Sequence, residues 1–183
     1  MKTVAEMAAV GFGLPADAFT SKMHCAPHLL APTGSNLKEH GKLGTVFAAY
    51  HYDLNFLTIH GKSRFSGLYV WTRDGRKMLV KVPDGCLLLQ AGKQFEWLTG
   101  GHVLAGFHEV VVNEAAVAAK EAAEQAGRSL WRISSTLFGH IASNQSLAPV
   151  GHFAKEPTAA SYPDVTAGEQ VLDELKAIAL ASQ

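Results

Sequence analysis

Two side chains able to bind a metal are separated by one residue at the end of a predicted strand. His51 and Asp53 flank Tyr52, and side chains at positions i and i+2 of a strand point to the same face of a sheet. An imidazole and a carboxylate therefore project together, as two neighbouring ligands of one ion would. Because the chain has nine histidines, a His-x-Asp sequence arises easily by chance, so this pair alone is a weak signal.

A third ligand must come from elsewhere, and His108 is the best candidate. It begins a predicted strand, 108–112, which a closed double sheet could return beside the first. Two imidazoles and one carboxylate on one face of an octahedron leave three positions open, as in Fe(II) oxygenases. Zinc more often occupies a closed tetrahedral site or one richer in His and Cys. We therefore expect His51, Asp53 and His108 to bind Fe(II).

A later strand carries groups suited to an organic anion. Arg132 and Ser134 share one face of the predicted strand 131–138. The planar guanidinium of arginine binds a carboxylate through two hydrogen bonds, and a serine hydroxyl can add another. The neighbouring residues are apolar, so the guanidinium is expected in a pocket, where a buried arginine requires an anion. The alternative is that Arg132 is an ordinary exposed strand residue.

Short strands with turns between them must position these residues. From Gly44 onward, runs of β-branched and aromatic residues alternate with turn signals, a pattern typical of a sandwich or barrel of jelly-roll type. Asp74-Gly75 predicts a hairpin. The predicted strands are 45–53, 55–60, 67–71, 78–82, 86–90, 108–112 and 131–138.

Helices are predicted around the sheets. One lies near the N-terminus, opened by a capping box of Thr3 and Glu6. Another occupies 114–126 between Asn113 as N-cap and Gly127 as C-cap. The last runs over 167–181 and is opened by a second capping box of Thr166 and Glu169.

The domain organisation follows from these elements. Residues 20–43 are rich in Pro and Gly and are interpreted as irregular connection, with one extended piece around residues 29–30. We divide the chain into an N-terminal helix and connecting segment (1–43), a β core with the inserted helix 114–127 (44–153), and a C-terminal tail and helix (154–183).

Composition indicates a globular protein. The chain has 183 residues, with 48% hydrophobic and 17% charged residues, which excludes a disordered or fibrous protein. Sixteen basic residues balance 16 acidic ones, so no nucleic-acid or anionic membrane partner is expected. No apolar run reaches the roughly 20 residues of a membrane span. Two cysteines and an early acid, Glu6, favour a cytoplasmic location over secretion.

The chain resembles the C-terminal catalytic region of the 2-oxoglutarate/Fe(II)-dependent dioxygenases of the isopenicillin N synthase-like family. The resemblance covers roughly residues 14–153, and its segments occur in the family's order and spacing. The segments that carry it are 51–58 (HYDLNFLT), 67–71 (GLYVW), 82–101 (VPDGCLLLQAGKQFEWLTGG), 108–112 (HEVVV) and 132–134 (RIS).

This resemblance implies a fold and a reaction. The fold is mainly β, a double-stranded β-helix (jelly roll) with peripheral helices. His51, Asp53 and His108 are implied to bind Fe(II), and Arg132 with Ser134 to bind the distal carboxylate of 2-oxoglutarate. The implied reaction converts 2-oxoglutarate and O2 to succinate and CO2 while a small organic substrate is hydroxylated or desaturated. Ascorbate is an implied accessory reductant, and Asp53 argues against halogenation.

The sequence also departs from the family pattern. The family's N-terminal region is expected to be absent. Residues 29–32 (LLAP) lack the Asn-x-Tyr that often precedes a proline, and Glu109 replaces a common arginine. These departures leave a second hypothesis, a catalytically impaired fragment or paralogue that acts as a binding or regulatory module. A third, another jelly-roll metalloenzyme such as an isomerase or thiol dioxygenase, is disfavoured by the pair Arg132 and Ser134.

Several other residues carry expectations of their own. His60 and His102 are alternative ligands, but each is expected to face solvent. His140 or His152 could line the pocket. Cys86 lies in an apolar run and is expected to be a buried, inert thiol.

Overall fold

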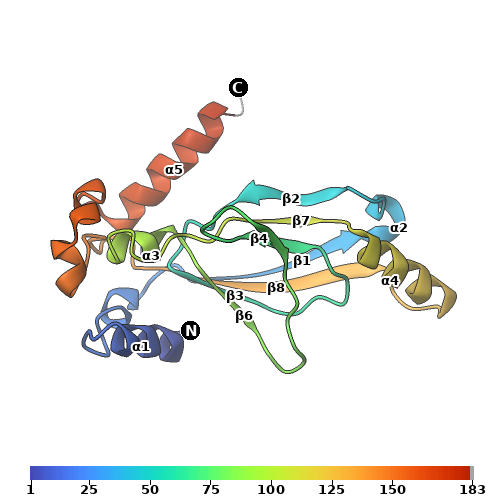
Figure 1. The fold of residues 1–183 in the computed structure, drawn as a ribbon, viewed down its shortest axis with the longest axis horizontal. Coiled ribbons are helices and arrows are strands. Elements are labelled where there is room, and N and C mark those ends of the chain that lie inside the picture. Colours follow the sequence, from blue (N-terminus) through green and yellow to red (C-terminus); the bar gives the residue numbers. More distant parts are fainter. Residues whose placement is uncertain (182–183) are drawn as a thin grey trace.

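The structure is a computed structural model that describes residues 1–181, and it contains two four-stranded sheets (Figure 1). The strand orders are β1-β8-β3-β6 and β2-β7-β4-β5, and every pairing within them is antiparallel. Helices lie at both ends of the sheets (Figure 1). This is the jelly-roll architecture with peripheral helices that the sequence predicted.

The elements have the following bounds. The strands are β1 (Leu29–Asn36), β2 (Val46–His51), β3 (Leu57–His60), β4 (Leu68–Trp71), β5 (Lys77–Leu79), β6 (Leu88–Ala91), β7 (His108–Val111) and β8 (Trp131–Gly139). The α-helices are α1 (Lys2–Gly11), α2 (Leu37–His40), α3 (Lys93–Leu98), α4 (Glu114–Gln125) and α5 (Ala167–Ala181). Three 3-10 turns span Thr20–Met23, Gly151–Lys155 and Pro157–Ser161.

All seven predicted strands are present, and the predicted hairpin is confirmed. Strands β4 and β5 pair antiparallel with Trp71 opposite Lys77. The turn between them places Gly75 at φ +80°, a conformation that glycine adopts without steric cost.

Strand β1, which was not among the seven predicted strands, corrects the expectation that residues 20–43 are mostly irregular. Strand β1 pairs with β8 along its whole length, so residues 29–36 belong to the same sheet as the predicted core. Pro32 and Gly34 suggested a loop, but β1 is an edge strand, and an edge strand tolerates a proline because one side of it needs no ladder hydrogen bonds.

The helix predictions were mostly confirmed. In α4 the Asn113 side chain accepts a hydrogen bond from the Ala116 N–H, and Gly127 follows the helix at φ +62°. In α5 the capping box between Thr166 and Glu169 forms as predicted. The capping box predicted for α1 was wrong, because α1 begins after Met1 without a side-chain cap. Helices α2 and α3 were not predicted.

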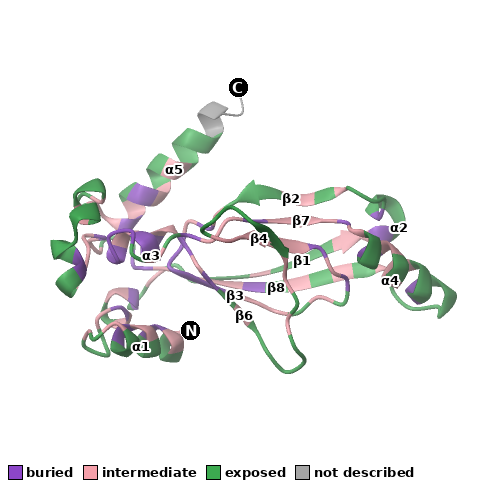
Figure 2. Ribbon diagram, viewed as in Figure 1, coloured by how far each residue is buried: buried purple, intermediate pink, exposed green. Residues whose placement is uncertain are grey.

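The main core lies where α1 and α3 pack against one end of the sheets (Figure 2). Its centre is aromatic: the ring centroid of Phe56 lies 5.2 Å from that of Phe19 and 4.8 Å from that of Phe95. A smaller cluster around Leu37 and Val112 packs under α4 at the other end.

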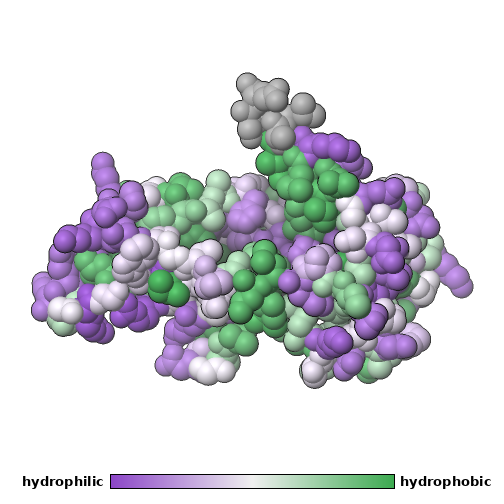
Figure 3. All heavy atoms as spheres, turned by 180° about the vertical axis from the view of Figure 1, so that it is seen from behind, coloured by the Kyte–Doolittle hydropathy of each residue, from purple (hydrophilic) through white to green (hydrophobic). Residues whose placement is uncertain are grey.

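Some apolar surface remains outside these clusters. Figure 3 shows hydrophobic surface along α5, where Leu172 and Leu175 are exposed. None of the described helices is long and apolar enough to cross a membrane.

A tight backbone contact joins β6 and α3 to the loop that follows β2. The N–H groups of residues 92–94 donate to carbonyl oxygens of the loop 53–56 over 2.8–3.1 Å. Gly92 makes this approach possible, because a Cβ at that position would lie 2.0 Å from the carbonyl oxygen of Asn55. The backbone position of Asp53 therefore depends on a glycine 39 residues later in the chain.

We predict that Gly92→Ala lowers the free energy of unfolding by about 1–3 kcal/mol or more, because the added Cβ collides with backbone atoms. The matched control is Gly11→Ala, where a Cβ would meet nothing within 4 Å. Urea unfolding of both variants checks this, and equal stability of the two would contradict the role of Gly92.

Candidate metal centre and adjoining pocket

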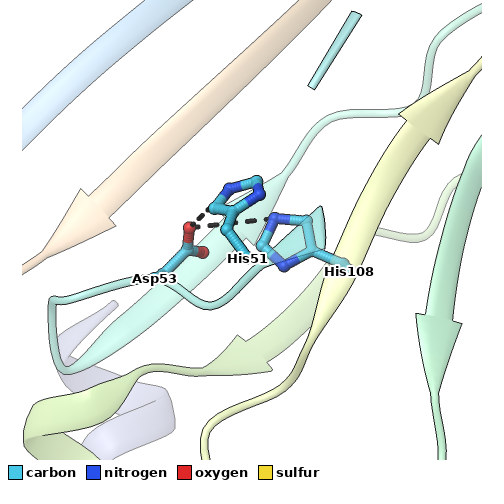
Figure 4. A group of neighbouring side chains, drawn as sticks. All are labelled: His51, Asp53 and His108. Carbon is cyan, nitrogen blue, oxygen red and sulfur yellow. Dashed lines mark ion pairs between the residues drawn. The ribbon is translucent and has the colours of Figure 1, made fainter. Parts of the chain in front are cut away.

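The three predicted metal ligands converge. His51 ends β2 and lies opposite His108, the first residue of β7, while Asp53 follows two residues after His51. The Nε2 atom of each histidine lies 3.8 Å from Asp53 Oδ1 (Figure 4). One ligand atom from each side chain lies within 4.8 Å of the other two.

The remaining polar atoms of two of these side chains are held by the protein. His51 Nδ1 lies 2.6 Å from the carbonyl oxygen of Ala49. The buried carboxylate of Asp53 accepts a hydrogen bond from the Thr58 hydroxyl through Oδ2, over 2.6 Å. His51 Nε2 and Asp53 Oδ1 therefore remain available to an ion, since hydrogen bonds to the far atoms orient metal ligands in this way.

His108 is the most enclosed imidazole of the three. Burial lowers the pKa of His108, with Asp53 acting in the opposite direction, so burial favours the neutral ring that metal binding requires. Binding through Nε2 requires a hydrogen on Nδ1, which lies 3.1 Å from the Gly106 carbonyl oxygen and 2.7 Å from Gln90 Nε2. Turning the Gln90 amide would offer its unpartnered Oε1 to that hydrogen.

The donor set fits Fe(II). Two imidazole nitrogens and one carboxylate oxygen on one side of an ion leave several coordination positions open, a pattern of non-haem Fe(II) oxygenases rather than of closed zinc sites. His51 is also partly open to solvent, whereas Asp53 and His108 are buried. An exchangeable ion with accessible positions is therefore compatible with this site.

A cavity of about 510 Å³ extends from the three ligands between the two sheets. Arg132 and Ser134 line it from β8, opposite Ser35 and Thr33 of β1 respectively, which line it too. The structure thus brings both predicted anion-binding residues to the cavity that holds the metal ligands. Thr33 and Ser35 were not predicted, because Pro32 and Gly34 favour an irregular connection after the extended piece at residues 29–30.

Arg132 fits an anionic occupant of this cavity. Its Nε atom is buried without a hydrogen-bond partner, and burial lowers the pKa of Arg132. A buried guanidinium with an unused donor is costly unless an anion meets it. A carboxylate can accept two of its hydrogen bonds at once.

The expectation that His60 faces solvent was wrong. His60 lines the cavity, its Nε2 is buried without a partner, and its ring centroid lies 5.8 Å from that of His108. Burial lowers the pKa of His60. The sequence contained the signal, because His60 lies two residues after Thr58 on β3 and so shares its inward face.

Other expectations had mixed outcomes. His102 is exposed, as predicted. Cys86 is exposed in the turn before β6, so the prediction of a buried thiol was wrong. An apolar run does not bury a residue when the run begins in a turn. His140 and His152 are not among the residues that line the cavity.

Comparison with known proteins supplies a family. Residues 32–141 match the model of the family described as the 2OG-Fe(II) oxygenase superfamily. The matched segment contains the three metal ligands together with Arg132 and Ser134. A comparison with curated proteins found no match.

Solved structures with the same fold include three from different organisms. A full-length protein from Neurospora crassa in complex with alpha-KG matches with a TM-score of 0.76 and 16% identity, over 95% of this chain and 52% of that chain. A putative 2OG-Fe(II) oxygenase family protein from Caulobacter crescentus matches with a TM-score of 0.76 and 24% identity, over 96% of this chain and 53% of that chain. A dioxygenase for auxin oxidation from Arabidopsis thaliana with 2-oxoglutarate matches with a TM-score of 0.68 and 20% identity, over 88% of this chain and 53% of that chain. The chain spans about half the length of these proteins.

We predict that Asp53→Asn and His108→Ala each abolish binding of one equivalent of Fe(II), or of Co(II) as a spectroscopic substitute, because each removes one of three ligands. His102→Ala is the control, since His102 is exposed and outside the cavity. Metal titration measures the effect, and wild-type affinity in both ligand variants would exclude this metal centre.

Thr58 is expected to act through Asp53. Thr58→Val should weaken metal binding about 10-fold, because loss of the hydrogen bond to Oδ2 frees the carboxylate to rotate. Thr99→Val is the matched control, as Thr99 is also buried and hydrogen-bonded but outside the cavity. The idea fails if both valine variants bind metal equally well.

Proposed function

Because the chain belongs to the 2OG-Fe(II) oxygenase superfamily, we propose that it couples oxidative decarboxylation of 2-oxoglutarate to hydroxylation or desaturation of a small organic substrate. One observation carries the proposal: the three candidate metal ligands and Arg132, a half-buried arginine whose buried Nε donor is unused, line the same cavity. The overall reaction turns 2-oxoglutarate and O2 into succinate and CO2, with the second oxygen atom going to the substrate in a hydroxylation.

The side chains divide this work between them. His51, Asp53 and His108 would hold Fe(II), which when bound supplies the electrons that activate O2. Arg132 pairs with the distal carboxylate of 2-oxoglutarate and so fixes the direction in which the diacid lies. The Ser134 hydroxyl donates a further hydrogen bond to the same carboxylate.

Strand register supports this orientation of the diacid. On β3, Thr58 touches Asp53 and pairs with Phe138 of β8. Thr136, Ser134 and Arg132 follow Phe138 as successive inward residues of β8, and all line the cavity. Arg132 is therefore the cavity residue of β8 that lies furthest along the strand from the level of Thr58, as an anchor for the distal carboxylate would.

We predict that Arg132→Gln raises the KM for 2-oxoglutarate by about 10- to 100-fold, because a charge-assisted pair in a buried site is lost. Arg132→Lys should restore binding only in part, since an ammonium lacks the planar two-donor geometry. The control is Arg128→Gln, because Arg128 is exposed and outside the cavity.

Succinate formation tests the function itself. Protein supplied with Fe(II), O2 and 2-oxoglutarate should release succinate and CO2 in equal amounts, slowly without substrate and faster with one. Binding of Fe(II) and 2-oxoglutarate without any succinate release would instead indicate the non-catalytic binding module.

A further inference from the structure

The chain as a whole is electroneutral, but its cavity is not. Lysine and arginine together number 16, as do aspartate and glutamate. The residues that line the cavity nevertheless include one acid, Asp53, and four cations, which are Lys62, Arg64, Lys81 and Arg132.

Three of these cations lie on two segments at the cavity's exposed edge. Lys62 and Arg64 follow β3, and Lys81 follows β5; all three are exposed. Lys62 forms an ion pair with Asp84, which joins the two segments and neutralises that lysine. The edge therefore keeps two cations that no acidic side chain pairs with among the described residues, Arg64 and Lys81.

These two cations differ in how firmly they are placed. An Arg64 guanidinium nitrogen donates to the Ser129 carbonyl oxygen over 2.9 Å, and the group lies 5.3 Å from the centroid of the Phe65 ring. These contacts hold the charge in position without neutralising it. Lys81 makes no hydrogen bond or ion pair with any described residue and is free to move toward a ligand.

The charges of the metal ion, of 2-oxoglutarate and of the residues proposed to bind them do not neutralise Arg64 and Lys81. A divalent ion and a dianionic 2-oxoglutarate cancel each other, and Arg132 offsets Asp53. Two positive charges remain at the edge of a concave site, where protein charges raise the local concentration of anions and discriminate between ligands.

Apolar side chains also form part of the cavity wall. They include Phe47, Phe65, Leu68, Val80, Val110 and Phe138. A ligand that satisfies both regions has an apolar body and an anionic group at one end.

We propose that Arg64 and Lys81 select a prime substrate that is an apolar carboxylic acid, whose carboxylate stays at the cavity edge while its apolar part extends toward the metal ligands. This inference rests on the proposed function. The other source of the same chemistry is 2-oxoglutarate itself, which the two cations would then attract in addition to Arg132.

The test uses protein loaded with Mn(II) and 2-oxoglutarate, so that binding is measured without turnover. Calorimetry compares phenylacetate and hexanoate with phenylacetamide and hexanamide. The acids should bind about 10-fold more tightly than the amides, and the preference should shrink as salt is raised. Arg64→Ser combined with Lys81→Ser should remove the preference.

The matched control combines Lys2→Ser with Lys155→Ser, which removes the same charge from exposed positions outside the cavity and should keep the preference. Equal binding of acids and amides to the wild type overturns the inference, as does a preference that survives loss of Arg64 and Lys81. If no probe binds, succinate release is compared across a panel of apolar acids and their amides. Stimulation by the amides as well as by the acids, or by no acid, then overturns it.

Two further measurements separate the possible failures. The dissociation constant of 2-oxoglutarate for the Mn(II)-loaded Arg64/Lys81 double variant should stay within about twofold of wild type. A loss there as large as the loss for the acids would assign both cations to the co-substrate and overturn the inference. If the wild type binds no 2-oxoglutarate at all, the proposed function fails instead.

Discussion

The position of Asp53 is the constraint on which the site depends. Its backbone carbonyl accepts a hydrogen bond from Lys93 N–H over 2.8 Å, and its carboxylate accepts another from Thr58 over 2.6 Å. The backbone contact fixes where the residue lies, and the side-chain contact fixes which oxygen faces the two imidazoles. A buried carboxylate held in this way, with no Lys or Arg paired to it among the described residues, favours a cation between itself and the histidines.

The two sheets contribute different parts of the chemistry. Strands β2 and β7 provide the two histidines as a cross-strand pair, while β8 of the other sheet provides Arg132 and Ser134. The distance between the candidate metal ligands and Arg132 is thus set by how the sheets pack. At one end of the sheets, Phe56 packs against Phe19 and Phe95 in the main core, three residues after Asp53. Stability and geometry of the site are coupled there.

The local sequence pattern predicted the candidate site residues, while the wrong predictions concern features that depend on the tertiary structure. The pairs at 51/53 and 132/134 were recognisable because strand alternation places them on one face without reference to the rest of the fold. Strand β1 was predicted only as an extended piece at residues 29–30, because Pro32 and Gly34 indicate a turn and are acceptable in a strand only at an edge position. The prediction that His60 faces solvent was wrong because it relied on His60 being the last residue of its strand, although strand alternation puts the side chain inside. The prediction that Cys86 is buried was wrong because hydrophobic neighbours in the sequence do not reveal which residues of a turn are buried.

The cavity combines three forces that act over different distances. Charges at its edge would act first on an approaching ligand, because salt screens a charge only beyond a Debye length of roughly 8–10 Å. The apolar wall acts only on contact, by removing ligand surface from water, and so favours a matching shape and size. The candidate metal ligands would act last and on a single atom, because coordination requires distances near 2 Å. Whole-chain electroneutrality therefore does not describe the cavity, because the charges of the chain are unevenly placed around it.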